Sequence, residues 1–282
     1  MKVSKIRPFA LCLALGLALA GVAPVADVLA ADPASVDAST QPERVARWKA
    51  IAAQIFGDRE IEPTETLIKL DAPTRAEDAA LVPVTLTMPE QDTIKSVYLV
   101  IDDNPSPLAA HVIFGPAAYP GSLQLRVRID TYTNVHAVAE TRDGRLFGTV
   151  AFVKASGGCS APAGVSDEEA MTGMGEMRLR FAQGAAPGQP TQTTLMIRHP
   201  NFNGMQMDQV TRNYTPPRYI DKVSVSHGSS KVFDLETDIS LSTHPVITFS
   251  LVADGNNPVN VSVSDTKNGR WEQSFEVPVT TN

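Results

Sequence analysis

Short runs of alternating apolar and polar residues recur along most of this chain, and turn-forming residues separate one run from the next. Val82–Met88 alternates in this way, and Ile94–Ile101 alternates up to the turn-forming sequence Asp102-Asp103-Asn104-Pro105. Alternation with a period of two gives a strand one buried face, and short strands at regular intervals are typical of β-sandwiches. The sequence therefore predicts an all-β sandwich fold rather than an α/β fold.

The β pattern stops near the middle of the chain, in a stretch of small residues from Ala155 to Gly164. Its Gly, Ser, Ala and Pro content is typical of a linker. We therefore predict two β-sandwich domains, over residues 42–154 and 176–282, joined by a cysteine arm and linker over residues 155–175. Because a short linker gives the two domains a high effective concentration, we expect them to pair within one chain.

Two segments have helical rather than β character. Pro42–Phe56 carries apolar residues at helical spacing, which predicts a helix packed on the first domain. This apolar stripe consists of Val45, Trp48, Ile51, Ala52 and Ile55. Ser166 precedes Glu169 by three positions, the spacing of a capping box, which predicts a second, short helix.

The first residues of the chain have the features of an export signal. Lys2, Lys5 and Arg7 give a positive start, and an almost wholly apolar run extends from Phe9 to Val22. The segment Val28-Leu29-Ala30 then offers small residues at the positions that a signal peptidase recognises. The apolar run is too short for an ordinary membrane span.

We therefore assign residues 1–30 to a signal peptide that is cleaved after Ala30 or Ala31, a retained anchor being the alternative. Residues 31–41 are predicted to form a flexible leader. We expect a periplasmic protein with no membrane span after cleavage. The formal net charge of -7 makes nucleic acid an unsuitable partner.

The cysteine count restricts the chemistry of the mature protein. Cys12 leaves with the signal peptide, so Cys159 remains as a single thiol in an oxidising compartment. An odd cysteine in an exported protein indicates an intermolecular bond, a reactive thiol or a buried bystander.

The residues around Cys159 favour a reactive thiol over a buried one. Gly157 and Gly158 remove side-chain bulk before it, and Ser160 keeps the other side slim. We predict that these four residues form a mobile arm with an exposed thiol whose pKa is close to the usual value of about 8.5. A buried cysteine acting as a small apolar residue is the alternative.

Other site chemistries have less support. Met171, Met174 and Met177 recur every third residue, with Met205 and Met207 further on, and soft sulfur ligands of this kind would suit Cu(I). Methionines at this spacing are, however, more usual in apolar cores. No two histidines stand at zinc-ligand spacing; they are His111, His136, His199, His227 and His244. A dyad of Cys159 with His199 or His136 stays open, and Asp102-Asp103-Asn104 is interpreted as a turn rather than a calcium site.

Several motifs resemble a known family. The first half contains Leu67–Pro73, Ala76–Val84, Val100–Ala109 and a final Gly157-Gly158-Cys159. The second contains Ile197–Asn201, Pro217–Ile220 and a closing Asp265-x-x-x-Gly269. With these residues the chain resembles a SoxYZ sulfur carrier of bacterial thiosulfate oxidation, in a fused form similar to the quinoprotein dehydrogenase-associated SoxYZ-like carriers.

This resemblance implies two immunoglobulin-like β-sandwiches that pair with each other. It also implies a non-enzymatic carrier, without a cofactor, that holds sulfur intermediates covalently on Cys159 and presents them to periplasmic enzymes. The partners implied are Sox-type enzymes or a quinoprotein dehydrogenase. The sequence departs from the family where Ser160-Ala161-Pro162 replace the two glycines after the cysteine, and where the arm is tethered at both ends.

The leading hypothesis is therefore a covalent carrier of sulfur or related thiol-bound intermediates. The alternatives are a binding or scaffold module for a quinoprotein dehydrogenase, in which the thiol is incidental, and a Cu(I)-handling protein. An enzyme acting alone is disfavoured, because no general base or oxyanion site is evident in the sequence.

Overall fold

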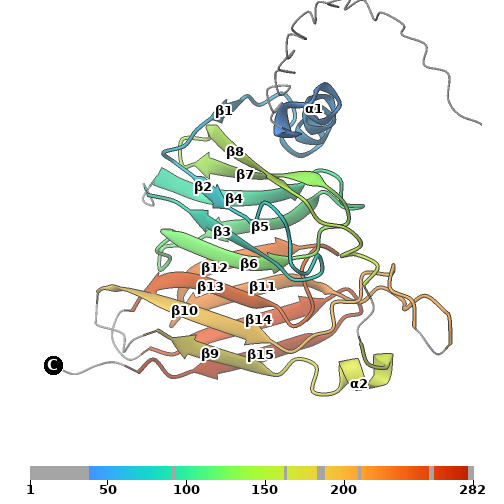
Figure 1. Cartoon of the computed structure of the whole chain (residues 1–282). Coiled ribbons are helices and arrows are strands. Elements are labelled where there is room, and N and C mark those ends of the chain that lie inside the picture. Colours follow the sequence, from blue (N-terminus) through green and yellow to red (C-terminus); the bar gives the residue numbers. More distant parts are fainter. Residues whose placement is uncertain are drawn as a thin grey trace, which may run out of the picture. The chain divides into compact units, whose positions relative to one another are not determined.

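The computed structural model describes residues 38–89, 93–161, 164–182, 188–208, 211–253 and 257–278. The signal peptide predicted over residues 1–30, and Pro162 of the predicted arm, lie outside these ranges. Two sheets pack face to face around an apolar core (Figure 1). No helix in the described ranges has the length and apolar character needed to cross a membrane.

Strands are the main secondary structure of both halves of the chain. The first half contains η1 (Ala38–Thr40), α1 (Pro42–Phe56), β1 (Ile61–Pro63), β2 (Lys69–Asp71), β3 (Val82–Thr87), β4 (Ile94–Ile101), β5 (Leu108–Phe114), β6 (Ser122–Val127), β7 (Thr133–Thr141) and β8 (Leu146–Val153). The second half contains α2 (Asp167–Met171), β9 (Met177–Phe181), β10 (Pro190–Ile197), β11 (Ile220–His227), β12 (Ser230–Thr237), β13 (Val246–Val252), β14 (Val259–Asp265) and β15 (Arg270–Phe275).

The two halves share both sheets. One sheet has the strand order β1-β8-β7-β4-β5-β12-β11-β14-β15, and the other has the order β2-β3-β6-β13-β10-β9. Antiparallel pairing of β5 with β12 joins the halves in the first sheet, and β6 pairs with β13 in the second. The predicted pairing of the two sandwiches within one chain is confirmed.

Alternation in the strands produces the core as expected. In β3 the side chains of Val82, Val84 and Leu86 are buried, whereas Pro83 and Thr87 between and after them are exposed. Buried residues from both halves belong to one continuous cluster, which runs from Ile68 in the first half to Val277 in the second. The all-β, two-sandwich fold class is confirmed.

Helix α1 covers the outer face of the first sheet beside β7 and β8 (Figure 1). Phe56 packs against Val138 of β7, and Trp48 stacks on His136 with ring centroids 3.7 Å apart. Burying one large apolar side chain in this way stabilises the fold by about 1.5–3 kcal/mol. Because the core covers its other face, β7 is buried along its whole length.

Two expectations about the first half need correction. Val45 of the predicted packing stripe is 53% exposed, so the stripe contacts the sheet through its later residues. The leader predicted over residues 31–41 is not wholly free, because η1 lies within it and the carbonyl oxygen of Ser39 accepts a 2.9 Å hydrogen bond from Asn134 Nδ2.

The other predicted elements agree closely with the structure. Helix α1 has the predicted bounds, and in α2 the Ser166 hydroxyl accepts a hydrogen bond from the Glu169 amide, as the capping box predicts. Strand β6 ends at Val127, directly before Arg128. That end decides where the next side chain points.

Candidate functional site

The segment that carries Cys159 is docked on the first half. The amide of Gly157 donates a 2.7 Å hydrogen bond to the carbonyl oxygen of Asp130, and the amide of Gly158 donates one of 3.1 Å to that of Ile129. The Ser160 hydroxyl then donates to the Gly157 carbonyl at 3.3 Å and closes a turn. We call residues 157–161 the cysteine arm, and this arrangement its docked state.

Both glycines are required by this docking. Gly157 has a φ of +76°, a conformation that side chains disfavour. A Cβ atom on Gly158 would lie 2.0 Å from the carbonyl oxygen of Ala79, which leaves no room for any side chain. The glycines predicted to make the arm mobile therefore also let it pack tightly.

The thiol of Cys159 is buried, contrary to the prediction of an exposed group. The residue is 0% exposed in the docked state. Burial, reinforced by the negative charge of Asp130 and opposed by Arg128, raises the pKa of the thiol to about 12. The expected pKa of about 8.5 is therefore wrong for this state, because the sequence does not reveal what packs on the arm.

A short segment after β6 forms the floor of the docked arm. Asn104 holds this segment through two hydrogen bonds and joins it to the second half of the chain through a third. Its Nδ2 atom donates to the carbonyl oxygen of Arg128 and to Ser240 Oγ, both at 2.8 Å, and its Oδ1 atom accepts from the amide of Asp130 at 2.9 Å. The turn predicted at Asp102-Asp103-Asn104 therefore supports the arm.

The second half covers the arm from the other side. Asn203 Nδ2 donates a 2.6 Å hydrogen bond to the carbonyl oxygen of Cys159, and Gln206 Nε2 donates one of 3.1 Å to that of Ala161. Asn203 and Gln206 are themselves buried. The thiol thus lies between the two halves of the chain.

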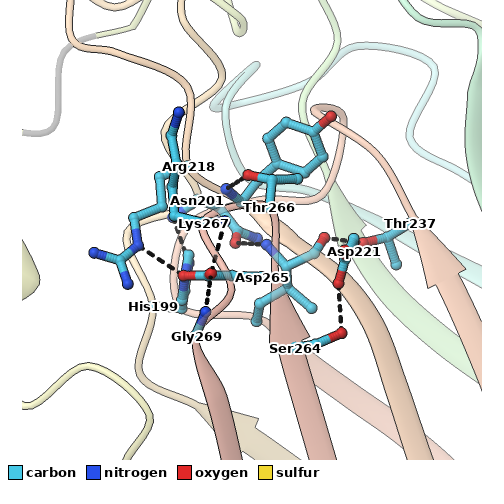
Figure 2. A network of polar contacts seen from close by, with 12 residues as sticks. His199, Asn201, Arg218, Asp221, Thr237, Ser264, Asp265, Thr266, Lys267 and Gly269 are labelled. Carbon is cyan, nitrogen blue, oxygen red and sulfur yellow. Dashed lines mark hydrogen bonds and ion pairs between the residues drawn. The ribbon is translucent and has the colours of Figure 1, made fainter.

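A buried polar network holds the covering segment in place (Figure 2). His199 Nδ1 accepts a 3.0 Å hydrogen bond from the Asn201 amide, so its proton resides on Nε2, which lies 3.3 Å from Asp265 Oδ2. Arg218 Nε donates to the same oxygen at 2.7 Å. The network joins three of the motifs noted in the second half.

The loop before Asn203 is fixed from this network. Asn201 Oδ1 accepts a 3.0 Å hydrogen bond from the amide of Ile220, and Asn201 Nδ2 donates one of 2.9 Å to the carbonyl oxygen of Ser242. Burial lowers the pKa of His199, so the imidazole stays neutral. These contacts make His199 a structural residue that positions the cover of the arm.

Neither histidine considered for a dyad joins the thiol. His136 Nε2 lies 3.2 Å from Asp102 Oδ2, and His199 is engaged with Asp265, so both rings have aspartate partners. The other three histidines lie in different elements: His111 of β5 stacks on Tyr98, His227 is buried in β11, and His244 is exposed before β13. In the part of the chain that the structure describes, no group of three or more His, Cys, Asp or Glu side chains is arranged to hold a metal.

The methionines considered for Cu(I) do not behave as a uniform group. Met177 is buried in the core at the start of β9, as usual for a core methionine, whereas Met171 and Met174 are half-buried on and after α2.

Sequence reasoning missed the residues that enclose the thiol. Arg128 follows the last residue of β6; continued alternation would have pointed it to solvent, but the strand ends at Val127 and the side chain turns inward. Asn203 and Gln206 lie in a stretch without periodicity, and only its amide-rich composition distinguishes it.

Comparison with protein families gives two matches in tandem. The family model of the sulfur oxidation protein SoxY matches residues 52–159, ending at Cys159, and that of the sulphur oxidation protein SoxZ matches residues 177–276. Together the matches cover most of the chain. No match is found among curated protein sequences.

Solved structures include similar chains. The sulfur carrier protein SoxY from Chlorobium limicola f thiosulfatophilum is 27% identical, with 39% of this chain and 93% of that chain covered and a TM-score of 0.35. The superoxide reductase (neelaredoxin) from Ignicoccus hospitalis is 13% identical, with 32% and 79% covered and a TM-score of 0.29.

Proposed function

Because this chain belongs to the SoxYZ sulfur-carrier family, with a SoxY and a SoxZ domain fused in one chain, we propose that it carries sulfur intermediates covalently on Cys159. The observation that supports this role most directly is the position of the thiol. It lies in a glycine-containing turn that is held between two domains by a few hydrogen bonds, so a local movement is enough to present it.

The docked and released states of the arm have complementary tasks. In the docked state the thiol is enclosed and protonated, which protects it and a bound intermediate from unwanted reaction. In the released state the thiol regains its ordinary pKa and is accessible to a partner. Local opening of a segment with few buried apolar contacts requires much less free energy than global unfolding.

Loading the carrier requires a partner that accepts electrons. When the thiol of Cys159 joins a sulfide-level sulfur, such as the outer sulfur of thiosulfate, a sulfur–sulfur bond forms, the thiol proton leaves to solvent and two electrons must pass to an oxidant. We therefore propose redox enzymes of the periplasm as partners, either of the Sox type or quinoprotein dehydrogenases. No cofactor of the carrier itself is needed for this step.

Intact mass spectrometry tests the proposed function. The mature protein is purified without reductant from its native periplasm and weighed before and after thiol reduction. We expect a reducible adduct on Cys159 with the mass of added sulfur or sulfur oxyanion. Recovery of only the unmodified thiol, under conditions in which the sulfur-oxidising enzymes are active, would refute the carrier role.

Burial of Cys159 also favours a second candidate function. A thiol that stays enclosed suits a scaffold that binds a quinoprotein dehydrogenase and uses the cysteine only for packing. A pull-down from periplasm with wild type and Cys159→Ser separates the two functions. A scaffold retains its complex and its physiological effect in the variant, whereas a carrier loses the effect.

A further inference from the structure

Arg128 has an unusual environment for a charged side chain. Only 2% of the residue is exposed, and its Nε atom is buried without a hydrogen-bond partner. No carboxylate of the described residues is within ion-pair distance of its guanidinium group. Burial of a charge that lacks a partner is strongly unfavourable, and a bound anion that supplies the opposite charge is one arrangement that would relieve this cost.

The guanidinium group of Arg128 points to the cysteine arm. Its Nη1 atom lies 3.5 Å from the carbonyl oxygen of Gly158, which is the long end of the range for a hydrogen bond. Its charge interacts with Cys159 and, more weakly, with Asp78, and burial is the main influence on its pKa, which it lowers. A cation is therefore held beside the thiol with one long hydrogen bond to a neutral carbonyl and, among the described residues, no carboxylate partner.

The backbone of Arg128 gives this cation a rigid base. Its amide donates a 2.7 Å hydrogen bond to the carbonyl oxygen of Ser240, and its carbonyl oxygen accepts from Asn104 at 2.8 Å. Ser240 belongs to the second half and Asn104 to the first. The position of Arg128 is thus set by both domains, independently of the arm.

When Cys159 carries no cargo, the docked arm does not neutralise the positive charge of Arg128. With a pKa raised to about 12, the docked thiol is protonated at physiological pH and carries no charge. A sulfur oxyanion or persulfide attached through Sγ would place a negative charge at this point. Guanidinium groups match oxyanions especially well, because their fork of N–H donors forms short, charge-assisted hydrogen bonds.

We propose that Arg128 binds the negative charge of the cargo on Cys159 while the loaded arm is docked. This inference rests on the proposed carrier function and adds a recognition residue to it. The docked state then holds an anionic load more tightly than a neutral load of similar size. Loading with an anion favours the docked arm, and removal of the charge by a partner enzyme favours release.

Two defined loads test this inference. The Cys12→Ser chain, in which Cys159 is the only thiol, is treated with tetrathionate or with methyl methanethiosulfonate. In the first reaction the thiolate attacks a central sulfur of tetrathionate, thiosulfate leaves, and the anionic Cys159–S–S–SO₃⁻ forms. In the second, methanesulfinate leaves and the neutral Cys159–S–S–CH₃ forms. Mass spectrometry verifies both adducts.

Amide hydrogen exchange of Gly157 and Gly158 reports on docking, because both amides are hydrogen-bonded only to the floor segment in the docked arm. We expect exchange at least about tenfold slower with the anionic load than with the neutral one, the usual effect of a charge-assisted hydrogen bond. Equal rates, or faster exchange with the anionic load, would overturn the proposal.

Arg128→Gln removes the cation, and Arg126→Gln is its matched control, because Arg126 is exposed two residues earlier in β6. The ratio of the amide exchange rate with the neutral load to that with the anionic load should fall to about one in Arg128→Gln and persist in Arg126→Gln. An unchanged ratio in Arg128→Gln would also refute the role. If Arg128→Gln does not fold, Arg128→Lys takes its place, with a ratio between that of wild type and one expected because a lysine lacks the planar fork.

A second readout separates recognition from a purely structural role. Because the empty protein buries an unpaired charge, Arg128→Gln without load should melt at the same temperature as wild type or higher. A lower melting temperature would show that Arg128 stabilises the empty fold and would contradict the proposal. Failure of these tests leaves the carrier role intact, since that role depends on the adduct recovered from the periplasm.

Discussion

The side-chain amide of Asn203 donates a 2.6 Å hydrogen bond to the backbone carbonyl of Cys159. A residue of the SoxZ domain therefore binds the backbone of the turn that carries the thiol of the SoxY domain. This contact gives the second domain a defined part in controlling the arm, beyond its part in completing the sheets.

Asn203→Ala should make the arm open more often. Loss of one hydrogen bond of about 1 kcal/mol corresponds to roughly a fivefold larger open population. We expect iodoacetamide to alkylate Cys159 faster by about this factor, while the melting temperature changes little. Asn213→Ala is the control, because Asn213 is exposed in the same segment. Equal rates in wild type and Asn203→Ala would show that the amide does not restrain the arm.

Gly158→Ala should prevent docking altogether. The added Cβ would meet the Ala79 carbonyl oxygen at 2.0 Å, so the arm must leave its floor. We expect Cys159 to be alkylated at nearly the rate of a free thiol, with a pKa close to the ordinary value. Ser156→Ala, at an exposed position just before the arm, should behave like wild type. A buried thiol in Gly158→Ala would contradict the docked geometry.

The reactivity of Cys159 should depend on pH in a distinctive way. Burial raises the pKa of the docked thiol from its ordinary value near 9 to about 12, so the protonated thiol favours docking and the thiolate favours release. Docking is therefore fully stable below pH 9 and weakens as the pH rises from there to about 12.

We expect the logarithm of the wild-type alkylation rate to keep rising with a slope of about one well above pH 9, since the thiolate exists mainly in the released arm. In Gly158→Ala the rate should level off near pH 9, as for a free thiol. Stopped-flow measurements over this range decide the matter, and a wild-type profile that levels off at the same pH would rule out a strongly raised pKa.

Asp265→Ala should destabilise the SoxZ domain and loosen the cover of the arm. Although burial opposes its ionisation, hydrogen bonds from Arg218 and the backbone hold the pKa of Asp265 below the ordinary value. Removal of the carboxylate leaves buried donors without an acceptor, which costs about 3 kcal/mol and lowers the melting temperature by roughly 6–12 °C.

The same variant links the network to the thiol. Faster alkylation of Cys159 should accompany the loss of stability, because the network holds Asn201 (Figure 2), two residues before the Asn203 side chain that contacts the arm. Asp143→Ala serves as the control, since that carboxylate is exposed in the β7–β8 hairpin. A normal melting temperature in Asp265→Ala would show that the network contributes nothing to stability.

Most of the fold follows from the sequence because local patterns determine it. The alternation of Ile94–Ile101 gives β4 with the predicted bounds, and the stripe in Pro42–Phe56 gives α1. Such patterns reflect burial on one face of an element and can be read from adjacent residues. The sheet order across β5 and β12 depends on contacts between distant segments, and only the expectation that the halves pair was available from the sequence.

The site was predicted only in part for the same reason. Cys159 and its two glycines were identified from their local composition, but the burial of the thiol results from groups distant in the sequence, such as Asn203, 44 residues away. The pKa of a group depends on everything packed around it, including Arg128 and Asp130. A sequence pattern shows a slim arm and does not show the surface that receives it.

The shared sheets of the two domains have a consequence for how the carrier behaves in dilute solution. In a two-chain assembly, separation of the subunits would expose the edges of β5 and β6 and uncover the cysteine arm, and dilution would favour this dissociation. Here β5–β12 and β6–β13 join segments of one polypeptide, so the stoichiometry is always one to one. The enclosure of the thiol is therefore independent of protein concentration, and the chain should unfold in a single cooperative transition.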